Sequence, residues 1–445
     1  MRQTLLMRAF IAGGLLVAAA GRLQPVAAAP AAISFPVAST LDVVDDAPGD
    51  GQCHTLVSSP AGGLCTLRAA VMEADATSGA GAAIIVPAGI YSLTISASGS
   101  DGPEKGDLNL TAPSDGDPLI TITGAGAGRT IIDANQLDRV LRVALGRTAA
   151  ISGLTLRNGY LVADYGAGIY NLGHATLDHV AISGSLVVIS SGYQAGGMQN
   201  SGMLTITDST IGPNNTAYFC GGLCNDGTLL IERSTITGNR AGDGGGAGIY
   251  NDPGYSMVLL DSTISTNTTT NTGGGIYNGG TANVYNLTIA FNTADSANAA
   301  GNYGGGVDSG SGGTSAMRNT LLAGNNRGNG TPDDCNGTVQ TYGNNLLSTL
   351  DRCTLSPQDV GTTGALNDIL LIGPLANNGG PTLTHALLPG SNAIDGGDAS
   401  FGCTNEFGDL IATDQRGALR TLGAACDVGA LEALPPAAFL PLLRR

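Results

Sequence analysis

Residues Gly246–Asn267 read GAGIYNDPGYSMVLLDSTISTN and contain two short lines that recur along the chain. The first line is rich in glycine and returns as GAGIYN at 166–171, GGMQN at 196–200, GGLCN at 221–225 and GGGIYN at 273–278. The second line returns as HVAISG from 179, DSTIGPN from 208, RSTITGN from 233, NLTIAFN from 286 and NTLLAGN from 319. One apolar position therefore repeats every 25 to 33 residues, at Ile182, Ile211, Ile236, Ile264, Ile289 and Leu322.

A period of this length, with no helical pattern inside it, is typical of a solenoid of short strands. Each unit has too little apolar surface to fold alone. The units are therefore expected to stack, with each strand pairing in parallel with its equivalent about 4.8 Å further along the axis. Because parallel crossovers are right-handed almost without exception, we expect an all-β fold, a single-stranded right-handed parallel β-helix (a β-solenoid) over residues 81–355.

Asparagine and glycine mark the ends of the expected strands. Asn214, Asn239, Asn267, Asn292 and Asn325 stand where stacked side-chain amides can bond to one another and to turn backbone. The glycine runs are expected at corners that need a positive φ or a close approach of two backbones. A phosphate-binding loop is not indicated, because neither a helix nor a lysine follows these runs.

Composition supports a folded, repetitive chain. Of 445 residues, 69 are glycine, none is tryptophan and 12% are charged, yet 42% are hydrophobic. A disordered chain would carry less valine, isoleucine and leucine and more charge. Growth by repetition also explains a length that is large for one hydrophobic core.

The first 31 residues have the pattern of an export signal. Arg2 and Arg8 supply positive charge, residues 9–20 are apolar and residues 27–32 are small. Pro25 interrupts the apolar character before the roughly 20 residues that a membrane span requires. We therefore expect a signal peptide over 1–31, no transmembrane span, and a protein that is secreted or held at the cell surface.

The charge balance disfavours polyanionic partners. The formal charge is −16, and it becomes −19 without Arg2, Arg8 and Arg22 of the leader. Lys105 is the only lysine, so no basic patch is expected for nucleic acid or anionic lipid. The sequence leaves the oligomeric state open.

Eight cysteines behind an export signal indicate an oxidising compartment and up to four disulfides. Eight cysteines allow about 105 pairings, but the spacing favours local ones. The expected pairs are Cys53 with Cys65, Cys220 with Cys224, Cys335 with Cys353, and Cys403 with Cys426. Zinc binding is the weaker alternative, because only Cys220 and Cys224 are closely spaced and the histidines lie far off in sequence.

Residues 32–80 precede the repeats and are expected to cap the first coil. Leu67, Ala70, Val71 and Ala74 keep helical spacing, which predicts a short amphipathic helix closed by the first disulfide.

Motifs at both ends resemble those of a family of bacterial exported proteins. CTLRAAVMEADA, from Cys65, resembles the CSLREA motif, although Ala69 stands where that motif has Glu and Asp75 where the family often has Asn. PLANNGGPTLTHALLPGSNAIDGGDA at 374–399 and DQRGALRTLGAACDVGALE at 414–432 resemble the choice-of-anchor Q domain. The repeat lines are also similar to polymorphic outer-membrane protein repeats.

The resemblance implies a secreted or surface-attached β-helix of the pectin-lyase-like architecture, in a group that is mostly without assigned activity. It places a choice-of-anchor Q-like segment over 356–434. The last residues, 435–445, end in FLPLLRR and have the pattern of a short sorting tail, with a frayed end as the alternative.

Four acidic residues fall at or near equivalent places in successive units: Asp178, Asp208, Glu232 and Asp261. A hydrolase needs two carboxylates about 5 to 10 Å apart, which stacked coils can supply. We favour the interpretation that these residues are solvated on an outer face. Arg233 is the best-placed base for a lyase, yet no aspartate cluster surrounds it. The paired aspartates, Gly-His-Gly and Arg-x-Lys of polygalacturonases are absent.

Two other groups of side chains have weaker signals. Tyr170, Tyr250 and Tyr277 align in the first line and are expected to stack on the solenoid body, with a sugar-stacking stripe as the alternative. The four histidines are accompanied by no nucleophile motif; they are His54, His174, His179 and His385. We therefore assign no catalytic residue and no cofactor.

The acidic run DVVDDAPGDG is a weak candidate for Ca²⁺. Its carboxylates belong to Asp42, Asp45, Asp46 and Asp50, and turn carbonyls lie between them. The spacing does not match an EF-hand, and an exposed turn is the alternative interpretation.

Three functions remain open. We expect first a non-catalytic scaffold for adhesion or for binding of extracellular glycan or matrix, because the repeat has no local break in charge or ligand chemistry. An extracellular polysaccharide lyase or glycoside hydrolase is the second hypothesis, because parallel β-helices carry such enzymes while the fold alone does not confer the activity. A structural layer component that self-associates is the third.

Overall fold

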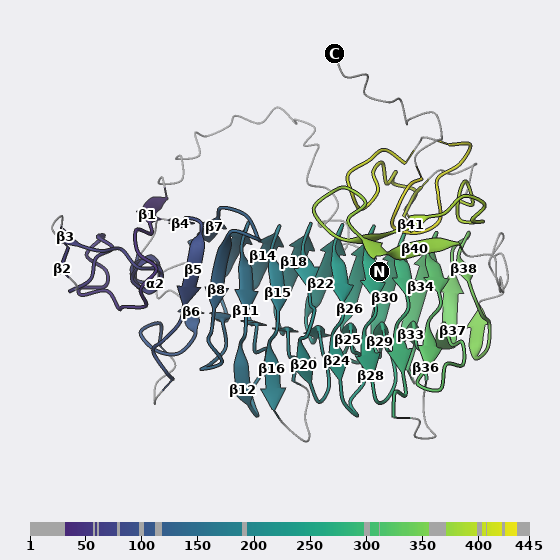
Figure 1. Cartoon of the computed structure of the whole chain (residues 1–445), viewed down its shortest axis with the longest axis horizontal. Coiled ribbons are helices and arrows are strands. Elements are labelled where there is room, and N and C mark those ends of the chain that lie inside the picture. Colours follow the sequence, from purple (N-terminus) through teal and green to yellow (C-terminus); the bar gives the residue numbers. More distant parts are fainter. Residues whose placement is uncertain are drawn as a thin grey trace, which may run out of the picture. The chain divides into compact units, whose positions relative to one another are not determined.

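Short strands wind into stacked coils, each of which passes through up to four strands in a fixed order (Figure 1). The computed structural model describes residues 32–56, 58–59, 62–77, 81–97, 102–111, 118–188, 194–297, 303–310, 312–355, 371–397, 403–405, 407–420 and 423–433. These residues belong to one compact unit that begins at Ala32. The predicted signal peptide and the predicted sorting tail lie outside the described residues.

The strands form four faces, named here in the order in which a coil visits them. Face 1 contains β6 (Leu108–Leu110), β9 (Leu141–Val143), β13 (Ile169–Asn171), β17 (Met198–Asn200), β21 (Leu223–Asn225), β25 (Ile249–Asn251), β29 (Ile276–Asn278) and β33 (Val307–Asp308). Face 2 contains β4 (Ala82–Val86), β7 (Ile120–Gly124), β10 (Thr148–Ser152), β14 (His174–Asp178), β18 (Met203–Thr207), β22 (Thr228–Glu232), β26 (Ser256–Leu260), β30 (Thr281–Tyr285), β34 (Thr314–Arg318) and β39 (Cys353–Leu355). The long strand β37 (Cys335–Thr341) pairs with both faces.

Faces 3 and 4 complete the coil. Face 3 contains β5 (Gly89–Ser92), β8 (Thr130–Asp133), β11 (Thr155–Arg157), β15 (Ala181–Ser183), β19 (Thr210–Ile211), β23 (Thr235–Thr237), β27 (Thr263–Ser265), β31 (Thr288–Ala290), β35 (Leu321–Ala323) and β38 (Leu346–Leu347). Face 4 contains β12 (Tyr160–Val162), β16 (Leu186–Val188), β20 (Thr216–Ala217), β24 (Arg240–Ala241), β28 (Thr268–Thr269), β32 (Thr293–Ala294) and β36 (Asn326–Arg327).

The repeating apolar position forms one continuous column inside face 3. Each strand pairs in parallel with its equivalent in the next coil, and the column residues are direct partners in this register. All six predicted residues are buried, from Ile182 to Leu322. Like residues therefore stack on like residues in a continuous apolar interior. The predicted right-handed parallel β-helix is confirmed.

Buried asparagine side chains form a hydrogen-bonded ladder at the corner between faces 1 and 2. Asn171 donates from Nδ2 to the Oδ1 of Asn200 at 2.7 Å, and the pattern continues to Asn225, Asn251 and Asn278 at 2.7 to 2.8 Å. Each amide nitrogen donates to the oxygen of the next, so these hydrogen bonds offset the cost of burying the polar groups.

A second amide ladder, at the end of face 3, confirms four of the five predicted asparagines. Asn239, Asn267, Asn292 and Asn325 are buried and joined by Nδ2 to Oδ1 hydrogen bonds of 3.0 Å. The prediction for Asn214 was wrong, because this residue is exposed and has a φ of 67°.

Asn215 takes the place expected for Asn214. It is buried, its Oδ1 accepts from the backbone N–H of Ser185 at 3.1 Å, and its Nδ2 donates to the carbonyl of Ile182 at 3.0 Å. The unit IGPNN has one more residue before its buried asparagine than the neighbouring units have. Asn214 accommodates this insertion by adopting a left-handed conformation.

Both predicted reasons for the glycine runs hold in the repeat at 246–248. Gly246 has a φ of 64°, a conformation that costs a non-glycine residue free energy. At Gly248, an added Cβ would lie 2.4 Å from the carbonyl oxygen of Gly275 in the next coil. The first line therefore needs glycine for its turn and for the contact between coils.

The predicted N-terminal helix is α2 (Leu67–Ala76), and it covers the first coil. The Thr66 side chain caps it by accepting from the Ala69 N–H, and residues 67–74 are buried. β1 (Ile33–Pro36) extends face 2 by pairing in parallel with β4, so the first coil has no free edge on this face. The helix is preceded by the short hairpin of β2 (Ser58–Ser59) and β3 (Gly62–Gly63).

The four predicted disulfides are all present, with Cα–Cα distances of 5.0 to 5.9 Å. They pair Cys53 with Cys65, Cys220 with Cys224, Cys335 with Cys353, and Cys403 with Cys426. Each links positions close in sequence, as the spacing indicates. Among the described residues, no helix is long and apolar enough to cross a membrane.

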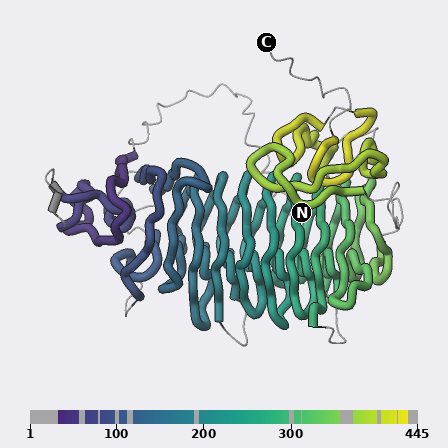
Figure 2. The backbone as a smooth tube through the Cα atoms, in the orientation of Figure 1, coloured from purple at the N-terminus to yellow at the C-terminus, as the bar shows by residue number. Residues whose placement is uncertain are grey.

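The C-terminal segment lies along face 3 in the second half of the solenoid, where Figure 2 shows it in green and yellow. It carries an antiparallel pair, β40 (Ile372–Ala376) and β41 (Thr384–Leu387). Outward side chains of face 3 bond to it: Thr235 donates to the Leu383 carbonyl, Thr263 donates to Gln415, and Thr288 accepts from the Ala430 N–H.

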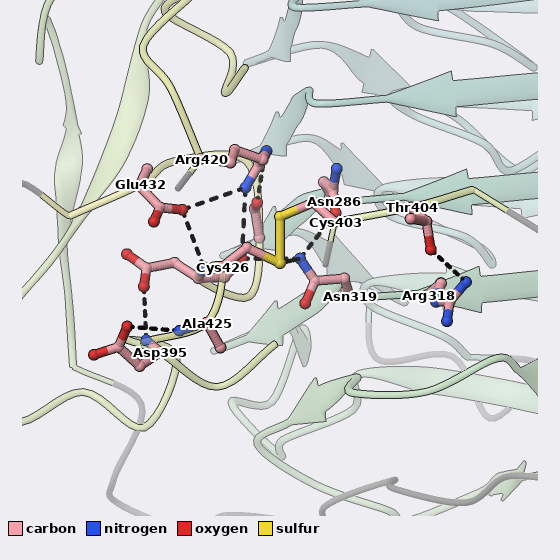
Figure 3. Close-up of a disulfide and its surroundings, with 12 residues drawn as sticks. Asn286, Arg318, Asn319, Asp395, Cys403, Thr404, Arg420, Ala425, Cys426 and Glu432 are labelled. Atoms are coloured by element: carbon pink, nitrogen blue, oxygen red, sulfur yellow. Dashed lines mark hydrogen bonds and ion pairs between the residues drawn. A yellow bond between two sulfur atoms is a disulfide. The ribbon is translucent and has the colours of Figure 1, made fainter. Parts of the chain in front are cut away.

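Figure 3 shows the disulfide of this segment beside the solenoid. Arg318 donates to the Thr404 hydroxyl at 2.9 Å, and Asn319 donates to the Asp427 carbonyl at 2.8 Å. The segment is therefore a covering of face 3, held by polar contacts to successive coils.

Candidate functional site

The outward side chains of face 1 form a column that is unlike the rest of the surface. In each three-residue strand the middle residue points away from the interior, and these residues are direct partners in the parallel register. The column reads Asn109, Arg142, Tyr170, Gln199, Cys224, Tyr250, Tyr277, Asp308 and Asn336. From Tyr170 onward it aligns aromatic rings, amides, a disulfide and a carboxylate from coil to coil, with Arg142 one coil before Tyr170.

A cleft of about 200 Å³ opens in this column and is called the first cleft here. It is lined by Tyr165, Gln199, Cys224, Asn225, Asp226, Tyr250 and Asp252. Asp226 directly follows β21 and Asp252 directly follows β25, so two carboxylates from adjacent coils face one cleft.

The two carboxylates of the first cleft differ in their surroundings. Asp226 accepts from the Nε2 of Gln199 and from the hydroxyl of Ser201, both at 2.9 Å. No described residue donates a hydrogen bond to the carboxyl of Asp252, and burial together with the charge of Asp226 raises its pKa. Asp252 is therefore a carboxyl that holds a proton more readily than an ordinary aspartate.

Two of the three tyrosines expected to stack on the solenoid body do so. Tyr250 is 6% exposed, with its ring stacked on Tyr277 at 4.6 Å and edge-on to Phe219 at 5.7 Å. These rings pack on the solenoid, as expected. Tyr165, which the sequence did not single out, is 40% exposed at the first cleft and lies 5.6 Å from the ring of Tyr170.

A second cleft, of about 460 Å³, lies further along the column. It is lined by Tyr277, Asp308, Ser309, Gly310, Gly312, Gly313, Asn336, Gly337 and Thr338. Asp308 is 2% exposed and accepts from Thr272 Oγ1 and, at 3.1 Å, from Asn336 Nδ2. Burial raises the pKa of Asp308 to about 7, so this carboxyl titrates near neutrality.

The four acidic residues singled out in the sequence do not line either cleft. Asp178 and Glu232 are the last residues of face 2 strands, whereas Asp208 and Asp261 follow at the corner, where both have a positive φ. They therefore occupy two positions of the repeat. Carboxylate oxygens of Asp178 and Asp208 lie within 4.8 Å of each other, but neither residue lines one of the two clefts.

Three of these acidic residues are held by arginines. Asp208 accepts from the Nη2 of Arg233 at 2.8 Å, and the same arginine pairs with Glu232. The interpretation of Asp261 as solvated was wrong: it is buried and accepts from Arg420 Nη2 at 2.6 Å, because the C-terminal segment covers that coil. Arg233 is thus occupied by carboxylates of the protein.

The Ca²⁺ candidates are separated into different surroundings. One ligand atom each of Asp45, Asp46 and His54 lie within 4.8 Å of one another. Asp42 is bound instead by the Arg68 guanidinium, and Asp50 accepts from the backbone N–H of Gln52. A similar group of ligand atoms belongs to Asp178, His179 and Asp208. Neither group has a further feature that indicates a bound ion.

Within the described ranges, His385 is the histidine with a hydrogen bond to a hydroxyl. His385 is buried, with its Nε2 2.9 Å from Ser265 Oγ and its Nδ1 2.8 Å from the Gly373 carbonyl oxygen. A backbone carbonyl stands where a Ser-His-Asp arrangement requires a carboxylate, and no cleft described here reaches the pair. This contact attaches the C-terminal segment to face 3.

A sequence signal for the first cleft exists in retrospect. The dipeptide Asn-Asp ends the first line in two consecutive units, at 225–226 and 251–252. The asparagines belong to the inner ladder, and the residue that follows each is carried outward at the corner. Gln199 and Tyr165 have no such repetition, so their place in the cleft could not be read from the pattern.

No family model matches the chain, and no curated protein matches it. Among solved structures, the chain is similar to a crystal structure of pectate lyase Pel9A. The TM-score is 0.41 and the sequence identity 16%, over 89% of this chain and 97% of the other.

Proposed function

We propose that this protein is a secreted or cell-surface β-helix scaffold that binds extracellular glycan or matrix along face 1 without turning it over. The observation that carries the proposal is the first cleft, in which an exposed tyrosine ring stands beside two carboxylates and an amide. An aromatic face suits the apolar side of a sugar ring, and carboxylate and amide oxygens accept hydrogen bonds from hydroxyls.

Export is part of the proposal and has two supports. The leader pattern at 1–31 is one, and the four disulfides are the other, since disulfides persist in oxidising compartments. We also propose that the chain belongs with the CSLREA and choice-of-anchor Q proteins, on the end motifs CTLRAAVMEADA and PLANNGGPTLTH.

A glycoside hydrolase is the second candidate, and one observation favours it. Asp226 and Asp252 face one cleft, and burial raises the pKa of Asp252, as a general acid requires. A lyase has less support, because the described lining of the two clefts contains no arginine or lysine that could act as the base.

The test is glycan-array binding by the purified protein and by two tyrosine variants. Tyr165 and Tyr255 are both 40% exposed, but only Tyr165 lines the first cleft. Tyr165→Ala is expected to weaken binding by about two- to tenfold, since an aromatic contact contributes about 0.5–1.5 kcal/mol. Tyr255→Ala is expected to bind like the parent protein. Equal binding by both variants would remove face 1 as the binding surface.

Turnover is measured on the same ligands. If the parent protein releases new reducing ends and Asp252→Asn does not, the hydrolase hypothesis replaces the scaffold hypothesis. Release of unsaturated products would point to a lyase. Binding without either product supports the scaffold.

A further inference from the structure

The first cleft contains a buried acceptor that the protein leaves without a donor. Gln199 is 3% exposed, and its Nε2 donates to Asp226 at 2.9 Å. Its Oε1 is buried, and no described residue donates to it. The carboxylate of Asp226 fixes the orientation of the amide, because it accepts from the nitrogen and would repel the oxygen.

The charged side chains of the cleft are both carboxylates. Asp226 and Asp252 line the cleft, and its described lining contains no arginine, lysine or histidine. The amide of Asn225 is used in the inner ladder, and Cys224 is in a disulfide. A ligand that enters here therefore meets two carboxyl groups and one amide oxygen, and it must bring donors and positive charge to satisfy them.

An aromatic ring stands beside these acceptors. Tyr165 is exposed at the cleft, and the face of a tyrosine ring attracts an ammonium group as well as the apolar side of a sugar. A primary ammonium has three donors and one positive charge, which matches the three acceptor groups. A uronate or a sulfated sugar would place an anion against Asp226 and Asp252, and like charges exclude such a ligand.

We infer that the first cleft selects glycans that carry a protonated primary amine, the chemistry of an N-deacetylated hexosamine polymer, through Gln199, Asp226 and Asp252. This inference rests on the proposed glycan binding and adds the class of sugar. It also distinguishes this site from one built for acidic polysaccharides, which needs cationic side chains.

The experiment compares three oligosaccharides of equal length by calorimetry at mildly acidic pH: glucosamine, N-acetylglucosamine and galacturonate oligomers. The glucosamine and N-acetylglucosamine oligomers share a backbone and differ only in the charged amine. The glucosamine oligomer is expected to bind at least about tenfold more tightly than its acetylated form, since a hydrogen bond to a charged group exceeds a neutral one. The galacturonate oligomer is expected to bind most weakly.

Asp252→Asn is the decisive variant, because no described residue donates a hydrogen bond to the Asp252 carboxyl and the substitution therefore removes none. It is expected to reduce the preference for the amine to about twofold or less while neutral oligomers still bind. Asp178→Asn removes an exposed carboxylate outside the cleft and is expected to keep the full preference.

The outcomes separate the two claims. Equal affinity for the glucosamine and N-acetylglucosamine oligomers would overturn the inference and leave glycan binding in place. Binding of none of the sugars would remove the proposed function itself. An oligolysine that binds the parent protein as tightly as the glucosamine oligomer, and loses affinity in Asp252→Asn, would show selection of charge alone and would also overturn the amino-sugar assignment.

Discussion

Arg420 donates from Nη2 to the Oδ1 of Asp261 at 2.6 Å, although the two residues are 159 positions apart. Both side chains are almost completely buried, with 1% and 4% of their surface exposed. The same guanidinium donates to the carbonyl of Gly429 at 2.9 Å, and Asn286 donates to the same carboxylate oxygen at 3.0 Å. This pair joins the C-terminal segment to the corner of a coil in the middle of the solenoid.

Replacing Arg420 by alanine is expected to detach the C-terminal segment. It leaves Asp261 as a buried charge without its cation, which costs about 3–5 kcal/mol. Arg240→Ala, which removes an exposed arginine from face 4, is the control and is expected to be neutral. The measurement is denaturant unfolding combined with limited proteolysis of the segment 371–433. Equal stability of the two variants would show that the pair does not hold the segment.

The ion pair of Asp261 with Arg420 is a feature that the sequence pattern could not predict. The apolar column and the four disulfides depend on residues at regular or short spacing, and the sequence predicted them. The burial of Asp261 depends on an arginine far along the chain, outside the repeat, so a local pattern classed it as solvated. The first cleft was missed for a related reason, because Tyr165 and Gln199 differ from their equivalents in other units.

Stability is expected to fall as the pH rises from about 4 to about 7. Burial raises the pKa of Asp261 to about 6 and those of Asp308 and Glu432 to about 7, above their ordinary values near 4. The folded state thus holds these protons more tightly than the unfolded state, and the stability they contribute is full below about pH 4 and lost at higher pH. Burial lowers the pKa of His385, which makes the folded state more stable as the pH rises. This single group opposes the three carboxyl groups and does not reverse their effect.

Thermal unfolding at a series of pH values checks this dependence. Asp308→Asn is expected to flatten the slope near neutrality, because it removes one of the titrating carboxyls. Asp243→Asn, which removes an exposed carboxylate, is expected to leave the slope unchanged. A melting temperature that rises steadily from pH 5 to pH 8 would contradict the prediction.

The adjacent residues Asn214 and Asn215 give a matched pair for the amide ladder. Asn215→Gly removes two buried hydrogen bonds, to the N–H of Ser185 and the carbonyl of Ile182, and is expected to cost about 2–3 kcal/mol. Asn214→Gly replaces an exposed residue whose φ of 67° glycine adopts easily, so it is expected to be neutral. Urea midpoints of the two variants decide this, and similar losses in both would argue against the shifted register.

The N-terminal cap is expected to depend on Arg68 and to be independent of added calcium. Arg68 is buried and donates to both carboxylate oxygens of Asp42, from Nε at 2.6 Å and from Nη2 at 3.2 Å. The backbone N–H groups of Thr94 and Ile95 donate to the same carboxylate, so protein donors occupy the first member of the acidic run. Arg68→Met leaves Asp42 buried without its cation and is expected to cost about 3–5 kcal/mol.

Arg129→Met, at an exposed arginine, is the control for this substitution and is expected to unfold at the parent temperature. A chelator is expected to leave the parent protein unchanged, since a site that bound Ca²⁺ in the folded state would add stability that the chelator removes. A lower melting temperature in the chelator, restored by calcium, would instead assign a cation to the carboxylates of Asp45 and Asp46. In that case Asp45→Asn would abolish the response to calcium and Arg68→Met would retain it, because Asp42 is not in that group.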